Sequence, residues 1–129
     1  MQFSKLSTIA LLGFFSFTNA YDMYLKGCST TNGSPTVADI NKVIDGLNRK
    51  HGCSQNNAFG TQCTTIQTNG GAHAGLCGYK WGWGNNKDME IDCHIVANAA
   101  MLVINKCSGA GGRASGEVQV SDVMRVTIF

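Results

Sequence analysis

The sequence predicts a small α+β domain in which two helices cover one face of a four-stranded antiparallel sheet. The element order is β-α-β-β-α-β, the ferredoxin-like (split βαβ) plan. Three observations indicate this fold. Two segments have the apolar spacing or content of helices, and the segments around them alternate as strands do. Six cysteines in a short chain predict three disulfides.

The first twenty residues have the features of a secretory signal peptide. Lys5 gives a short basic start, residues 6–17 form an apolar run, and Thr18 and Ala20 are small residues suited to cleavage. We therefore expect residues 1–20 to be removed and residues 21–129 to form one extracellular, secreted domain. No second apolar run approaches the ~20 residues of a membrane span, so no transmembrane segment is expected.

The first strand and the first helix follow the signal peptide. Alternation from Tyr21 predicts a strand that ends near Cys28. Thr36 and Asp39 resemble a helix capping box with Asp in place of Glu. The next apolar residues recur at helical spacing and predict an amphipathic helix that stops before Gly52: Val37, Ile40, Val43, Ile44 and Leu47.

A β-hairpin and a second helix come next. Segments 63–68 and 72–81 flank residues 69–71, Asn-Gly-Gly, and Asn-Gly is the strongest short signal for a hairpin. Asp88 is the expected cap of the second helix, which runs from Met89 to Lys106. This helix is apolar on most of its circumference, so we expect it to be deeply buried.

The tail from Glu117 to Phe129 alternates over an unusual length. A tight hairpin at residues 121–122 would place Val118 opposite Arg125 and so mix the two faces. A single long strand with a bend or bulge near Asp122 keeps the alternation, and this strand completes the predicted sheet.

Topology suggests how the cysteines pair. In the predicted fold, Cys53 follows the first helix and lies near Cys63, which opens the second strand. Cys28 ends the first strand and lies near Cys107, which ends the second helix at the opposite pole. Cys77 on the third strand and Cys93 on the second helix then remain to pair with each other. The predicted set is Cys28–Cys107, Cys53–Cys63 and Cys77–Cys93. No metal site is expected, since no C-x-x-C pair occurs.

Two tryptophans stand among glycines in the stretch GLCGYKWGW. On a strand, Trp81 shares a face with Cys77, and a bond from Cys77 to the second helix would put that face under the helices. Trp81 is therefore predicted to be core. Lys80 points to the opposite face, and Trp83 lies where the strand ends, so both are predicted to belong to a binding surface at the sheet edge.

The acid–base residues do not make a recognisable catalytic set. The nearest to one is a cluster of His73, Glu90, Asp92 and His94, in which Glu90 and His94 would share a helix face. A surface Glu–His pair near a helix start is the preferred explanation of it. No nucleophile elbow, zinc-protease helix or phosphate loop occurs. We predict no catalytic residue, no cofactor and no enzymatic activity.

The net charge of the chain does not indicate a particular class of partner. The formal net charge is +2, and no block of basic residues occurs, so no nucleic-acid partner is expected. Asn32 begins the sequon Asn-Gly-Ser and is a predicted site for N-linked glycosylation.

A family resemblance rests on the segments SPTVADINKVIDGLNRKHGC, GLCGYKWGW and EIDCHIVANAAMLVINKC, with a glycine-rich return to a final strand. Their order and cysteine placement resemble small secreted fungal killer-toxin-like and necrosis-inducing effector proteins. The resemblance implies a compact disulfide-linked α/β sandwich that acts on competing fungi or on plant hosts, and it implies no catalytic residue.

Three hypotheses follow. The first is a secreted effector or killer-toxin-like protein that binds a host or competitor target, which is an unknown protein or a cell-wall glycan. The second is a module that binds cell-wall glycan through Trp83 and its neighbours. The third is a small secreted hydrolase such as a ribonuclease, which would depend on His73 and His94.

Overall fold

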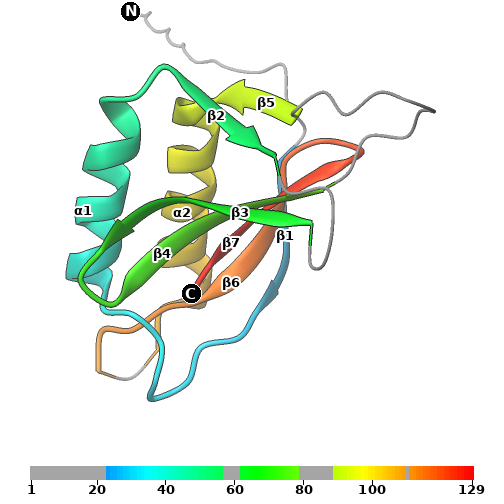
Figure 1. Cartoon of the computed structure of the whole chain (residues 1–129). Coiled ribbons are helices and arrows are strands. Elements are labelled where there is room, and N and C mark those ends of the chain that lie inside the picture. Colours follow the sequence, from blue (N-terminus) through cyan, green and yellow to red (C-terminus); the bar gives the residue numbers. More distant parts are fainter. Residues whose placement is uncertain (1–22, 57–61, 79–88, 110) are drawn as a thin grey trace, which may run out of the picture.

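The computed structural model describes residues 23–56, 62–78, 89–109 and 111–129. Within these ranges the chain forms two helices, a five-stranded antiparallel sheet and a separate two-stranded ribbon. Helices α1 (Val37–Asn48) and α2 (Cys93–Cys107) lie side by side against one face of the sheet (Figure 1). Neither of these described helices has the length and apolar character needed to cross a membrane.

The α+β class is confirmed, but the sheet differs from the four-stranded ferredoxin-like plan. Across the sheet the strands are, in order, β1 (Tyr24–Cys28), β6 (Gly116–Gln119), β7 (Met124–Ile128), β4 (Ala72–Gly78) and β3 (Cys63–Asn69). The hairpin β6–β7 stands between β1 and β4, so β1 becomes an edge strand, and all neighbouring strands are antiparallel.

The single long strand expected at the tail is wrong, because the tail turns back at residues 121–123. The N–H of Val120 donates to the carbonyl of Met124, and Val118 pairs with Val126. A three-residue turn between paired residues keeps even-numbered residues opposite even-numbered ones. The turn therefore preserves the alternation that seemed to require one strand.

The second helix begins later than expected. Residues Met89–Asp92 form β5, which pairs with β2 (Gly52–Gln55) in a two-stranded ribbon at one end of the helices (Figure 1). Asp92, not Asp88, is the N-cap, and its side chain accepts the N–H of His94. Pairing with a distant segment overrides the local helix signal, as tertiary context often does.

The first helix matches its prediction. Thr36 is the N-cap and its hydroxyl accepts the N–H of Asp39. The expected apolar residues form the stripe that faces the core, with Ile40 and Leu47 fully inaccessible and Val37 partly buried. The expected hairpin is also present, with Asn69 paired to Ala72 and a positive φ of 57° at Gly70.

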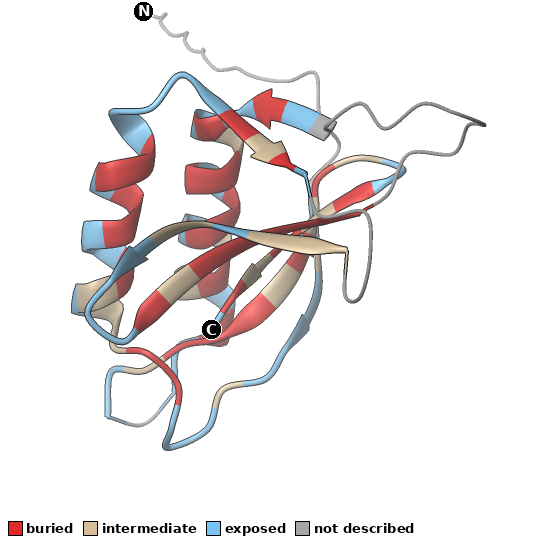
Figure 2. Cartoon of the chain, in the orientation of Figure 1, coloured by how far each residue is buried: buried red, intermediate tan, exposed pale blue. Residues whose placement is uncertain are grey.

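The core lies between the helices and one face of the sheet (Figure 2). The strand residues on this helix-covered face alternate with more exposed ones on β6 and β7. The buried strand residues include Ala72, Ala74, Leu76, Val118, Val126 and Ile128. The opposite face has no helix against it in the described part of the chain, and we call it the open face.

The structure forms three disulfides, and one is the predicted pair Cys28–Cys107. The predicted pairs Cys53–Cys63 and Cys77–Cys93 are wrong. The structure instead joins Cys53 to Cys93 and Cys63 to Cys77. Cys63 and Cys77 are directly opposed in the β3–β4 hairpin, with Cα atoms 4.0 Å apart. The β2–β5 ribbon pairs Cys53 with Ile91 and so brings it beside the start of α2.

Candidate functional site

The predicted binding residues Lys80 and Trp83 lie outside the residues that the structure describes, as does Trp81. The argument for burying Trp81 nevertheless fails. Cys77 bonds to Cys63 and faces away from the helices, while Leu76 on the same strand is fully buried beneath them. Asn32 lies in an exposed turn, where a glycan on its side chain would be tolerated.

The open face is organised in three rows that run across the strands. Directly opposed residues of antiparallel strands point to the same side, so the pairing register identifies each row. The first row is Tyr24, Gln119, Arg125, Cys77 and Cys63. The middle row is Gly27, Glu117, Thr127, Gly75 and Thr65. The last row is Phe129, His73 and Thr68.

The aromatic centre of this face is Phe129. Its main chain exchanges two hydrogen bonds with His73, and the two rings are stacked with centroids 5.1 Å apart. The His73 ring also bonds the Thr68 hydroxyl, with Nδ1 and Oγ1 3.0 Å apart. Phe129 covers Gly75, since a Cβ there would lie 3.3 Å from the Phe129 ring. The ring is held by its neighbours, yet Phe129 as a whole residue stays 49% exposed.

An ion pair and a hollow lie on the other side of the open face. The Arg125 guanidinium donates to the Glu117 carboxylate at 2.7 Å, and both side chains are about one-third exposed, at 37% and 35%. A hollow of about 400 Å³ lies beside them over β1, β6 and β7. Its lining comprises Lys26, Gly27, Cys28, Ser29, Gly116, Glu117 and Thr127. The absence of a side chain at Gly27 helps to shape it, since a Cβ there would meet no atom within 4 Å.

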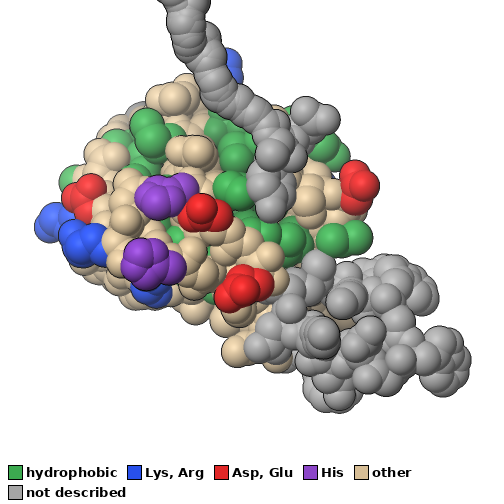
Figure 3. Space-filling model, turned by 90° about the horizontal axis from the view of Figure 1, so that it is seen from above, with side chains coloured by type: hydrophobic (Ala, Val, Ile, Leu, Met, Phe, Trp, Pro, Cys, Tyr) green, Lys and Arg blue, Asp and Glu red, His purple; other side chains and the backbone are tan. Residues whose placement is uncertain are grey.

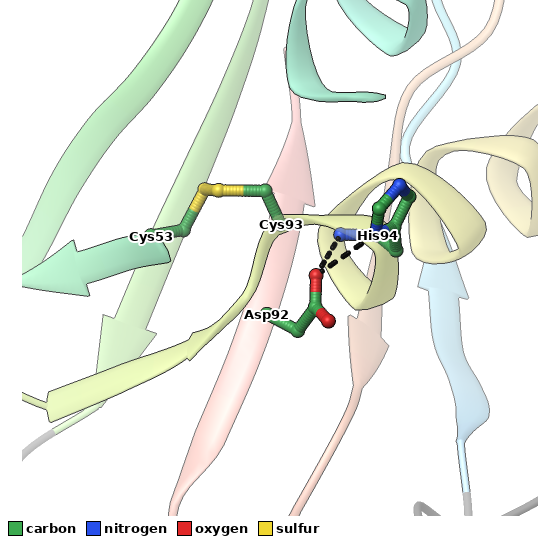
Figure 4. A network of polar contacts seen from close by, with 4 residues as sticks. All are labelled: Cys53, Asp92, Cys93 and His94. Atoms are coloured by element: carbon green, nitrogen blue, oxygen red, sulfur yellow. Dashed lines mark hydrogen bonds and ion pairs between the residues drawn. A yellow bond between two sulfur atoms is a disulfide. The ribbon is translucent and has the colours of Figure 1, made fainter. Parts of the chain in front are cut away.

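A second cluster of polar side chains lies where the two-stranded ribbon meets α2. Figure 3 shows two histidines gathered with acidic side chains on this end of the molecule. Asp92 bonds His94 twice, accepting its backbone N–H at 2.9 Å and lying 3.0 Å from its Nδ1 (Figure 4). The other ring nitrogen of His94 points away from Asp92.

A hollow of about 480 Å³ adjoins this cluster and is lined by His51, Gly52, Glu90, Ile91 and Asp92. The backbone hydrogen bond from His94 holds the pKa of Asp92 below its ordinary value, and the neighbouring charges of His94 and His51 add to this effect. Asp92 can therefore orient a histidine while it stays ionised. No group of three or more His, Cys, Asp or Glu residues in the described ranges could hold a metal ion.

The structure rearranges the acid–base set that the sequence predicted. Glu90 is on β5 and His94 on α2, so they do not share a helix face. His73 is on β4 and faces Phe129 and Thr68, with its ring bonded to neither Glu90 nor Asp92. His51 joins the cluster instead, through the pairing of β2 with β5.

Sequence reasoning missed Phe129 as a surface residue, although a signal was present. The tail alternation places Arg125, Thr127 and Phe129 opposite the buried even-numbered residues. That pattern alone would have predicted a polar and aromatic open face. The chain matches no known protein family and no curated protein sequence.

Proposed function

We propose that this is a secreted protein of the effector or killer-toxin-like kind, which acts by binding a protein on a host or competitor cell rather than by catalysis. The observation that carries the proposal is the open face, a broad surface with no helix against it in the described part of the chain. It presents an anchored aromatic residue, Phe129, and an arginine, Arg125, two rows apart along β7. Aromatic residues and arginine are the side chains most enriched among binding hot spots.

The disulfides support secretion. Three disulfides join all six cysteines, and such bonds persist mainly in oxidising, extracellular compartments. They also suit a small domain whose sheet is packed on one face only, because such a domain has a limited core. A rigid scaffold lowers the entropy that an interface loses on binding.

A protein target fits the open face better than a glycan. The face combines an ion pair, a histidine and a half-exposed phenylalanine, which is the mixed composition of protein interfaces. The glycan hypothesis depended on Trp83, which lies outside the described residues.

Binding of the fluorescently labelled, oxidised protein to fungal and plant cells tests the proposal. Phe129→Ser and Arg125→Ser should each weaken binding about tenfold or more, as loss of a hot spot does. Lys42→Glu, on the exposed side of α1, is the matched control and should bind like the parent. Thermal melts establish that each variant is folded.

Treatment of the cells with protease separates the target classes. The proposal expects protease to abolish binding. Binding that survives protease but is lost after glucanase or chitinase treatment would favour the wall-glycan hypothesis. Equal binding by the parent and both open-face variants would overturn the proposal.

A further inference from the structure

The two edges of the five-stranded sheet differ. Both edge strands bulge, β3 between residues 65 and 67 and β1 between residues 25 and 27. At the β3 edge, Lys50 Nζ donates to the Ile66 carbonyl at 2.6 Å. The N–H of Asn56 also donates to the Thr64 hydroxyl at 3.2 Å. The segment after α1 therefore covers part of this edge.

At the β1 edge, the described residues make no such contacts. The main chain of β1 bonds only to β6, and no hydrogen bond from the described ranges reaches its outer side. Every residue of β1 except Leu25 is exposed, including Tyr24 at 58%. An unpaired edge is a template on which another strand can add.

Two glycines in the middle row of the open face differ in whether a side chain covers them. Gly75 is covered by the Phe129 ring from the adjacent strand β7. Gly27 stands in the same row on β1, and a Cβ placed there would meet no atom within 4 Å. The hollow of about 400 Å³ opens beside it. An aromatic side chain from an added strand would cover Gly27 as Phe129 covers Gly75.

The charge of Lys26 determines which kind of segment could pair with β1. Lys26 lines the hollow and forms no ion pair with a described carboxylate, whereas Glu117 is already paired with Arg125. A second copy pairing through β1 would bring another Lys26 to the edge, and like charges on paired strands repel. A segment with an acidic residue near Lys26 would be attracted instead.

We infer that β1 binds an extended, acidic segment of the target protein, which pairs with the β1 main chain and lays an aromatic side chain over Gly27. This inference rests on the proposed function, since it names the part of the target that the sheet recognises. The main-chain bonds supply affinity, and the hollow and Lys26 supply specificity.

Selection from a random dodecapeptide library displayed on phage tests the inference with the oxidised protein. Selected peptides should contain an aromatic and an acidic residue at a fixed spacing. Synthetic copies should slow hydrogen exchange of the β1 amides. Lys26→Glu and Gly27→Val should each weaken their binding about tenfold or more. The control Lys42→Glu should leave peptide binding unchanged. Valine suits a strand, and Gly27 has free space, so Gly27→Val should fold.

Three outcomes would overturn the inference: no peptide is selected, the selected peptides lack an acidic residue, or their binding is unchanged by both β1 variants. The cell-binding assay separates this failure from that of the proposed function. Loss of cell binding by Phe129→Ser and Arg125→Ser but not by Lys26→Glu would retain an open-face target without strand addition.

Discussion

Gly78 lies directly against the main chain of Val123, and a Cβ at Gly78 would overlap the Val123 carbonyl oxygen. This contact joins the end of β4 to the turn between β6 and β7. Gly78 also has a φ of 143°, which L side chains rarely adopt. Gly78→Ala should therefore destabilise the fold by about 3 kcal/mol, from backbone strain and displacement of the turn.

Chemical denaturation measures this loss. Gly33→Ala is the control, because the nearest atom to its Cβ would be 3.7 Å away and its φ is ordinary. If Gly78→Ala unfolds at the same denaturant concentration as Gly33→Ala, then the close approach to Val123 is absent in solution.

The three disulfides should contribute unequally to stability. Cys28 and Cys107 are 79 residues apart in sequence, whereas Cys63 and Cys77 are 14 apart. In the loop-entropy account, replacing both partners by serine costs about 4.5 kcal/mol for the long loop and about 3 kcal/mol for the short one. Guanidinium unfolding of the two double variants checks this order.

Peptide mapping of the oxidised protein should recover Cys53 joined to Cys93. A peptide that joins Cys53 to Cys63 would contradict the fold.

Asp92 should make the stability of the fold depend on pH in the acid range. Its folded pKa lies below the ordinary value, so near that range the unfolded chain binds more protons than the folded one. The stabilisation is present above the unfolded pKa and is lost as pH falls through the folded pKa. Asp92→Asn can still cap α2 but cannot ionise. Its stability should fall less between pH 5 and pH 2 than that of the parent.

Urea unfolding at several pH values measures the Asp92 effect. Asp122→Asn, in the exposed β6–β7 turn, serves as the control and should follow the parent. A parallel pH dependence for Asp92→Asn and the parent would show that the bonds to His94 do not favour the ionised carboxylate.

Lys50 should limit self-association at the β3 edge. Its ammonium bonds the Ile66 carbonyl at the bulge, so an added strand could use that acceptor only by displacing Lys50. Lys50→Ala should change the free energy of unfolding by less than about 1 kcal/mol, as is usual for surface residues. It should nevertheless raise the fraction of dimer in analytical ultracentrifugation. Lys42→Ala removes an equal charge from α1, and an equal rise in that variant would assign the effect to net charge alone.

Local signals in the sequence predicted the elements whose structure depends on neighbours in the chain. Thr36 and the apolar stripe predicted α1, and Asn69-Gly70 predicted the hairpin. Apart from the turn at residues 121–123, which was expected to be a bend in one strand, the errors concern pairing between distant segments. Residues 89–92 have helix-like content, yet they pair with residues 52–55 as β5.

The errors at the site begin with the disulfides. The predicted set relied on the pole at which each element was expected to end. The predicted hairpin already opposed Cys63 and Cys77, and the unpredicted β2–β5 ribbon brings Cys53 to Cys93. The mistaken pairing placed Cys77 under the helices and reversed the two faces of β4. His51 was missed as a neighbour of Asp92, because 41 positions separate them along the chain.

Helix α2 begins at Cys93 and ends at Cys107, and both cysteines are cross-linked to other elements. The bond from Cys107 reaches back to Cys28 and encloses the chain between them. A protease that cuts one peptide bond anywhere in that interval leaves both pieces covalently joined. A nicked molecule would gain only the mass of one water and would separate only after reduction, so one cleavage would not release either piece.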